Sequence, residues 1–235
     1  MIPSKGLAKI YLVVFLVFVF SASRAQTRYQ QFTLGGGAGV ATAYAGAAQP
    51  QANPAFYTSA CYYPSTVFNV ELEGQAGMLS GVAPLRSIDL KSFRNNYESI
   101  ILDANLYLGV FFDPKKSAFL NVIKDFYGGI GYGVMANSIN NADLTSANTT
   151  DHVNNTLKII PVKGGYEYNI IRNKYNEPLL KADLSIRFYY VNGKGLDGYY
   201  DNYAKASSFY TYYAIGLKYT FIIKAPYGRG YNKFD

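Results

Sequence analysis

The sequence has no tryptophan, one cysteine and one histidine among its 235 residues. The single cysteine, Cys61, excludes an intramolecular disulfide and is expected to be a buried, small apolar side chain. The single histidine, His152, excludes a metal site made of several histidines. Lysine and arginine form no cluster, so the net charge of +7 does not indicate a nucleic-acid-binding surface. We therefore expect no metal, no cofactor and no nucleic-acid partner.

A hydrophobic run long enough to cross a membrane as a helix is also absent. The run at residues 10–20 has eleven apolar residues, whereas a transmembrane helix needs about twenty. Lys5 and Lys9 precede the run and small residues follow it, which is the pattern of a secretory signal peptide. We expect cleavage after Ala25, which removes three basic residues and no acidic one and lowers the net charge from +7 to +4. An uncleaved anchor is the alternative.

The sequence does contain a repeated alternation of apolar and polar residues. In residues 180–190, every second residue from Leu180 is apolar or aromatic, while Lys181, Asp183 and Arg187 lie between them. A period of two residues is typical of a β-strand with one apolar and one polar face. This pattern, together with two glycine-rich segments and one weak segment, predicts eight strands: residues 32–43, 55–63, 67–78, 100–110, 126–136, 160–170, 180–190 and 209–221.

The alternation alone does not say which face points outward. In a soluble barrel of the lipocalin type the apolar faces line the interior, whereas in a membrane barrel they face lipid. Lipocalins usually carry disulfides and a Gly-x-Trp start, and this chain has neither. The polar faces carry five carboxylates and four basic groups, a near balance that suits a filled lumen, because an unpaired buried charge costs several kcal/mol. These residues are Glu71, Glu73, Asp103, Lys163, Glu167, Lys181, Asp183, Arg187 and Lys218.

We predict an all-β fold, an eight-stranded antiparallel up-and-down transmembrane β-barrel of the bacterial outer membrane. It is expected to span residues 26–224 after a cleaved signal peptide (1–25), with 225–235 as a periplasmic tail. Eight strands leave room only for side chains, which favours a plugged lumen over a pore. The long polar connections are expected outside the cell and the shorter ones, including a short connector at 119–126, in the periplasm. The long set is 44–54, 82–96, 137–155 and 193–208, and the shorter set is 64–66, 113–125 and 171–177.

Several short motifs follow one another along the chain: FTLGGGAGVATAYAG at 32–46, Asn53-Pro54, the set Pro161, Gly164, Gly165 and Tyr168, GLDGYYDNY at 195–203, and IGLKYTF at 215–221. In this order they resemble the small eight-stranded outer-membrane barrels of the type IX secretion and gliding machinery. The chain is similar, more loosely, to small outer-membrane barrels in general. Many barrels end on the aromatic residue of the last strand, whereas fourteen residues follow Phe221 here.

The resemblance implies a structural or anchoring role, in which the inner turns bind a periplasmic ring complex. In this sequence those surfaces are 113–125, 171–177 and the tail. Basic and aromatic residues alternate in the tail, a pattern suited to contact with an acidic partner, and the candidate contacts are Arg229, Tyr231, Lys233 and Phe234. The expected partners are outer-membrane lipid and periplasmic secretion-complex proteins. The sequence does not indicate an oligomeric state.

Three other functions compete with this interpretation. An outer-leaflet lipid hydrolase needs a serine and an acid around a histidine, and no such set can be assembled around His152 and Asp151 in a polar loop, so we expect no enzyme activity. The glycine-rich strands lack the helix and the Lys-Ser/Thr pair of a phosphate-binding loop, and their glycines are expected to allow curvature and close packing. A small passive channel and a secreted ligand carrier remain alternatives.

Overall fold

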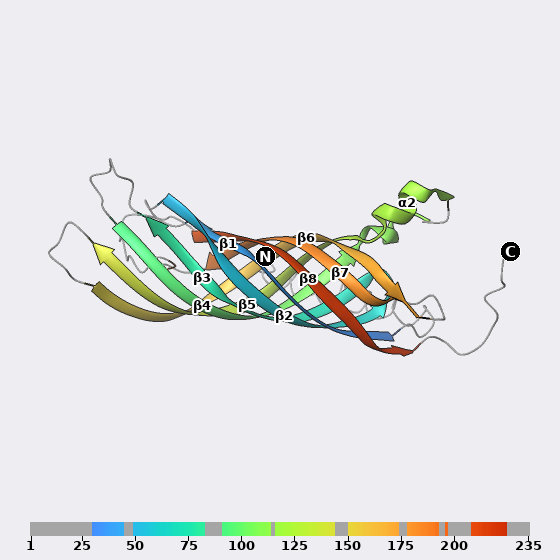
Figure 1. Cartoon of the computed structure of the whole chain (residues 1–235), viewed down its shortest axis with the longest axis horizontal. Coiled ribbons are helices and arrows are strands. Elements are labelled where there is room, and N and C mark those ends of the chain that lie inside the picture. Colours follow the sequence, from blue (N-terminus) through green and yellow to red (C-terminus); the bar gives the residue numbers. More distant parts are fainter. Residues whose placement is uncertain are drawn as a thin grey trace, which may run out of the picture.

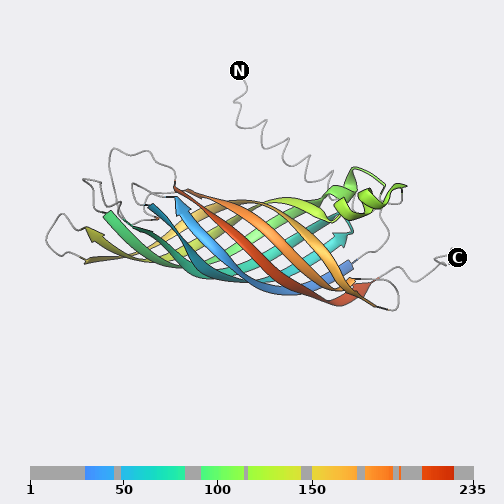
Figure 2. The same cartoon turned by 45° about the horizontal axis from the view of Figure 1, so that its top comes forward.

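The computed structural model describes residues 30–44, 49–82, 91–113, 116–143, 150–173, 178–192, 196 and 208–224. In this part of the chain, eight antiparallel strands form a closed ring (Figures 1 and 2), in which each strand pairs with the next and β8 pairs with β1. The strands are β1 (Gln30–Tyr44), β2 (Gln49–Ser65), β3 (Phe68–Val82), β4 (Lys91–Tyr107), β5 (Phe126–Asp143), β6 (Thr150–Arg172), β7 (Pro178–Asn192) and β8 (Ser208–Lys224). The predicted all-β, up-and-down barrel is confirmed.

The two ends of the ring differ in the length of the strands that reach them. In outer-membrane barrels the short turns face the periplasm, and we call the end that carries the Thr66–Val67 turn the periplasmic end. At the opposite, extracellular end, β5 and β6 reach furthest to the left in Figures 1 and 2. β6 alone has 23 residues, more than twice the 9–11 that a tilted transmembrane strand needs.

Strands extend into three of the four predicted long connections, whereas the fourth, 193–208, matches the end of β7 and the start of β8. Residues 137–155 were expected to form one loop, but β5 continues to Asp143 and β6 begins at Thr150. The ladder pairs Ser138 with Asn154 and Asn140 with His152, so His152 lies in a strand and not in a loop. In the same way, residues 91–96 and 49–54 form strand where a loop was predicted. These segments are mostly polar, so they lack the regular alternation by which a strand is recognised in a sequence.

The connector between β4 and β5 is the one predicted short connection with its own helices in the described part of the chain. It contains the 3₁₀ turn η1 (Leu108–Val110) and the helix α2 (Ala118–Ile123), so the predicted strand 100–110 ends three residues early. The Ser117 hydroxyl caps α2 by accepting a hydrogen bond from the Phe119 amide at 3.3 Å. No helix among the described residues has the length and apolarity to cross a membrane.

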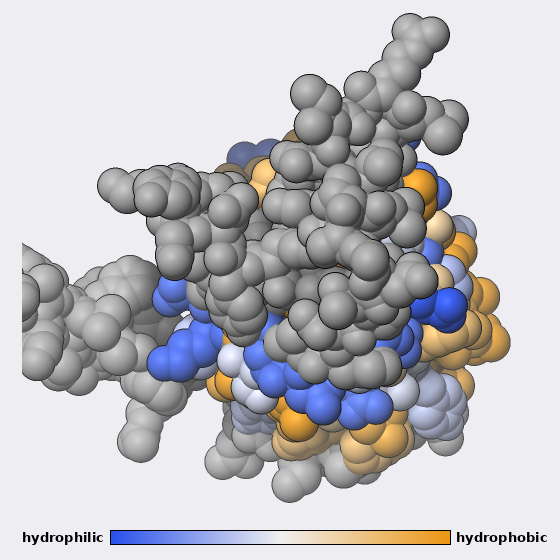
Figure 3. All heavy atoms as spheres, turned by 90° about the vertical axis from the view of Figure 1, so that its left-hand side faces the viewer, coloured by the Kyte–Doolittle hydropathy of each residue, from blue (hydrophilic) through white to orange (hydrophobic). Residues whose placement is uncertain are grey.

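The outer wall of the ring is mostly apolar, and the buried charged side chains lie on its inner face. Along β7, exposed and buried residues alternate, with Leu184, Ile186 and Phe188 outside and Ser185 and Arg187 inside. Apolar side chains are exposed on every strand, and Figure 3 shows them (orange) around the wall, with hydrophilic residues (blue) nearer the extracellular rim. This arrangement is the reverse of a soluble barrel, so the apolar faces point outward, toward lipid.

Candidate functional site

The nine charged residues predicted to face the lumen all lie inside the barrel. Each is at most 6% exposed, and together they are the buried charged residues of the part of the chain that the structure describes. Ion pairs no longer than 3.6 Å join seven of them into one network, and the remaining two form a separate pair. The network comprises Glu71, Asp103, Lys163, Glu167, Lys181, Asp183 and Lys218, and the pair is Glu73 and Arg187.

Lys218 on β8 is the centre of the network. Its Nζ lies 2.9 Å from Glu167 Oε1, 3.6 Å from Glu71 Oε1 and 3.6 Å from Asp183 Oδ1. Three carboxylates from three other strands therefore share one ammonium group. Because the closed ring brings β8 opposite β3 and beside β7, residues that are far apart in the sequence meet here.

Two further lysines complete the network at its edges. Lys163 donates to Glu71 Oε2 at 2.6 Å and to Asp103 Oδ2 at 3.0 Å, and Lys181 donates to Glu167 Oε2 at 2.9 Å. The network thus holds four carboxylates and three ammonium groups. Tyrosine hydroxyls compensate for the excess carboxylate, because Tyr127 and Tyr57 donate to Asp183 at 2.8 and 3.2 Å, and hydrogen bonds from neutral donors stabilise an anion.

Arg187 forms the second charged cluster. Its guanidinium pairs with Glu73 and lies 4.5 Å from the centre of the Tyr57 ring and 5.3 Å from that of Tyr212. The Nε and Nη2 atoms have no hydrogen-bond partner among the described residues. The two aromatic faces supply the cation–π contact that replaces them, so the cation is held by one carboxylate and two rings.

The extracellular half of the interior is filled by aromatic and apolar side chains, which the sequence interpretation did not foresee. The Tyr189 and Tyr210 rings stack with centroids 4.2 Å apart, and Tyr97 packs against Tyr210. Leu196, which belongs to the β7–β8 connection, is fully buried in this cluster, and its carbonyl accepts a hydrogen bond from Asn95 at 3.2 Å. Aromatic and apolar side chains therefore fill this half of the interior, beside the charged network that the sequence predicted.

The sequence held a signal for these inner tyrosines. Tyr189 has the same strand parity as Lys181, Asp183 and Arg187, and Tyr57 has the parity of Cys61, which is buried as expected. The parity did not indicate that glycines lie against the Tyr57 ring. A Cβ on Gly216 or on Gly37 would overlap the Tyr57 ring, so these two positions have room only for glycine beside that ring. The glycines were expected to allow close packing, and at these two positions they do so by leaving space for the Tyr57 ring.

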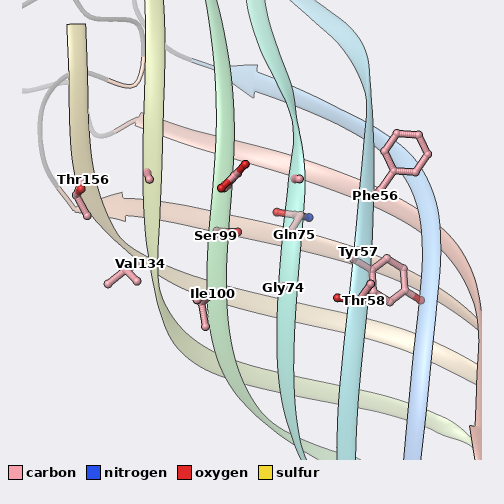
Figure 4. A pocket seen from close by; sticks show the side chains of 12 residues that line it. Phe56, Tyr57, Thr58, Gly74, Gln75, Ser99, Ile100, Val134 and Thr156 are labelled. Atoms are coloured by element: carbon pink, nitrogen blue, oxygen red, sulfur yellow. The ribbon is translucent and has the colours of Figure 1, made fainter.

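The outer wall carries one hollow of about 480 Å³ across β2–β6, shown in Figure 4. Its lining combines small residues, Gly74, Ala76 and Ala136, with the larger Phe56 and Ile100. It is open to the outside of the ring and is lined mostly by residues that point outward. The hollow is therefore a feature of the lipid-facing wall and not an enclosed ligand site.

Some predicted features lie outside the described residues. These are the signal peptide (1–25) and the tail contacts Arg229, Tyr231, Lys233 and Phe234. The described residues contain no group of three or more histidine, cysteine, aspartate or glutamate side chains that could hold a metal ion.

These features define a class of protein. A closed antiparallel ring pairs each strand with two neighbours, so that backbone groups bond within the wall, and this ring has apolar side chains outside and paired charges inside. Such a ring can span a lipid bilayer, and barrels of this architecture reside in the bacterial outer membrane. The chain is an eight-stranded β-barrel of the outer-membrane type.

Comparison with known proteins gives similarity in fold at low identity. No protein-family model matches the chain, and no curated protein matches its sequence. Neisserial surface protein A is 15% identical with a TM-score of 0.49, covering 81% of this chain and 97% of that chain. Ail, the attachment invasion locus protein of Yersinia pestis, is 10% identical with a TM-score of 0.48, covering 83% and 100%. OprG from Pseudomonas aeruginosa is 13% identical with a TM-score of 0.39, covering 82% and 96%.

Proposed function

We propose that the protein is a non-conducting anchor of the outer membrane, which holds interaction surfaces at the two ends of its barrel. The filled interior supports this proposal. In the middle of the lumen the charged side chains pair with one another, and toward the extracellular end stacked tyrosines and Leu196 occupy the space. A lumen filled in this way leaves the ends and the outer wall as the surfaces available for function.

The partner in this proposal is a periplasmic component of the type IX secretion or gliding machinery. Its support is the order of short motifs described above, and the segments assigned to partner binding are the connector 113–125, the periplasmic turn 171–177 and the tail. At the other end, the polar extensions of β5 and β6 reach beyond the apolar part of the wall. They would face the surroundings of the cell.

Conductance in planar bilayers tests the filled lumen. The purified wild-type barrel is expected to give no steady conductance. Arg187→Ala removes the guanidinium between Tyr57 and Tyr212 and is expected to introduce ion leakage, whereas Lys158→Ala on the outer wall is the matched control and is expected to behave as wild type. Steady conductance of the wild-type protein would contradict the proposal and favour a small passive channel.

Site-specific photo-cross-linking in cells of the source organism tests the periplasmic partner. A photoreactive residue in place of Arg172, at the periplasmic end of β6, is expected to cross-link to a periplasmic secretion protein that mass spectrometry identifies. The same residue in place of Asn154, on the extracellular extension, is the control. Equal adducts at both positions, or none at 172 despite incorporation, would contradict this part of the proposal.

The proposal treats the protein as a non-enzyme. Replacement of His152 by alanine is therefore expected to leave the lipid composition of the outer membrane unchanged, as measured by mass spectrometry of extracted lipids. A changed profile of deacylated lipid would instead favour a lipid hydrolase of the outer leaflet.

A further inference from the structure

The connector between β4 and β5 exposes more apolar surface than a periplasmic turn requires. Phe111 and Phe119 are 72% and 69% exposed, the two highest values among the large exposed hydrophobic residues in the described part of the chain. They exceed even the residues of the lipid-facing wall. Their neighbours in the connector share this exposure, and the complete set is Leu108, Val110, Phe111, Phe119 and Val122.

The exposed connector residues continue the apolar wall of the barrel. On β4 the outward residues Leu102 and Leu106 are exposed, and the chain passes from them directly into Leu108 and Val110. On the other side of the connector, the exposed Phe126 begins the apolar face of β5. The apolar surface is therefore continuous from the membrane-spanning wall into the connector.

The position of the connector relative to the ring is the second observation. In Figures 1 and 2, α2 lies at the periplasmic end and outside the ring, above the wall, and it does not cover the opening of the barrel. Both views agree on this placement. An element displaced sideways from a membrane barrel lies where the bilayer surface meets the wall.

The charges of the connector suit a membrane surface. Lys116 is exposed and Lys124 is partly exposed, where its Nζ donates to Asn121 Oδ1 at 2.7 Å. Asp113 and Asp125 are the acidic residues of the described connector. Apolar side chains flanked by lysines are typical of segments that lie in the interface, with the apolar groups among acyl chains and the ammonium groups near phosphates.

We propose that the 108–125 connector is an interfacial anchor seated in the inner leaflet of the outer membrane. Phe111, Phe119 and Val122 insert among the acyl chains of phospholipids, and Lys116 and Lys124 lie at the headgroup phosphates. Periplasmic turns of outer-membrane barrels are usually short, and membrane contact gives this long connector a role. The inference does not depend on the proposed partner, and it assigns the connector's apolar face to lipid instead of to that partner.

The absence of tryptophan from the chain gives a direct test. Phe119→Trp introduces the sole fluorophore of this type, and the full-length barrel is refolded in phosphatidylethanolamine–phosphatidylglycerol vesicles with and without brominated acyl chains. Leu102→Trp on the lipid-facing wall and Asn154→Trp on the extracellular extension are the references for lipid and for water. Mobility shift on heating verifies that each variant folds.

Blue-shifted emission and bromine quenching near the Leu102→Trp values are expected for Phe119→Trp. Emission and quenching values near those of Asn154→Trp would overturn the proposal and favour binding of a periplasmic protein by the connector. In the Phe119→Trp background, Lys116→Glu with Lys124→Glu is expected to reduce the quenching in these anionic vesicles, whereas Lys158→Glu on the wall is expected to leave it unchanged. Equal effects of the two changes would exclude the proposed headgroup contacts. The fluorescence results do not depend on whether position 172 cross-links to a periplasmic protein. The anchor proposal and the partner proposal can therefore be refuted independently.

Discussion

Lys218→Met is expected to destabilise the folded barrel by about 3–5 kcal/mol, the usual cost of removing one partner from a buried ion pair. Methionine is similar in length to lysine, so the change removes a charge while leaving little cavity. It leaves four carboxylates in the network with two ammonium groups, and Glu167, Glu71 and Asp183 lose their shared cation.

The size of the expected loss of stability follows from the distances between Lys218 Nζ and the three carboxylates. With an effective dielectric constant of about 20, each of the contacts at 2.9–3.6 Å contributes roughly 5 kcal/mol of attraction. Desolvation of the lysine in the folded protein offsets a large part of this sum. The remaining loss is smaller than the sum of the three contacts because the Tyr63 hydroxyl, 2.8 Å from Glu167 Oε1, and the two tyrosines at Asp183 still donate hydrogen bonds.

The assay is urea unfolding of the refolded barrel in phospholipid vesicles, with the folded fraction measured as the heat-modifiable band on a gel. Lys158→Met, which removes an exposed lysine between the polar Thr156 and the apolar Val162 on the outer wall, is the control and is expected to change stability by no more than about 1 kcal/mol, the cost of a charge near the membrane interface. Adding Asp183→Asn to Lys218→Met removes the carboxylate whose ion-pair partner in the described network is Lys218, and is expected to recover part of the loss. A Lys218→Met variant as stable as the control, or a double variant less stable than the sum of the single changes, would refute the charge-network reasoning.

Two further changes test the packing and the connector. Gly165→Ala is expected to lower stability by about 1–3 kcal/mol in the same assay, because its Cβ would lie 2.5 Å from the Tyr127 ring. Gly164→Ala is the control and is expected to be neutral, because its Cβ would meet only a carbonyl at 3.8 Å. Equal stabilities of the two variants would contradict this geometry. Burial raises the pKa of Asp125, with Lys124 opposing the shift, so the wild type is expected to lose stability as the pH rises from the ordinary aspartate pKa of about 3.9 through that raised value. Asp125→Asn is expected to lack this loss when the urea midpoint is measured against pH, and parallel profiles of the two proteins would contradict it.

The identity of the inner charges followed from the sequence because it depends on a local property. Within one strand, neighbouring side chains point to opposite faces whatever the rest of the chain does. Arg187 therefore had to point to the other face of its strand from Ile186 and Phe188, and Lys163 to the other face of its strand from Val162. Once the apolar faces are outside, the parity alone places all nine charges inside, and burial in the structure agrees with that assignment for each of them.

The ends of the strands could not be predicted in this way. Residues 137–143 and 150–155 are mostly polar, with the buried Ile139 as an exception, so their sequence resembles a loop. In the structure, Asn95 donates to Asn137 and Asn137 donates to Asn155, both at 2.8 Å, so that amide side chains bridge three neighbouring strands. The partner of each amide lies on another strand. A pattern read along one strand holds no information about such a bridge.

The tyrosines of β8 show the same limit at the candidate site. Tyr212 and Tyr213 are adjacent in the sequence, yet Tyr212 is buried against Arg187 and Tyr213 is exposed on the outer wall. Parity separates the two, but it does not say that the inner ring covers a guanidinium on β7, or that Tyr57 on β2 covers the same cation from another direction. These contacts arise only when β8 closes the ring onto β1, since closure brings β7 and β2 across the lumen from each other. The Arg187 guanidinium is therefore stabilised by the closed ring as a whole, which makes its replacement a test of whether the lumen is sealed.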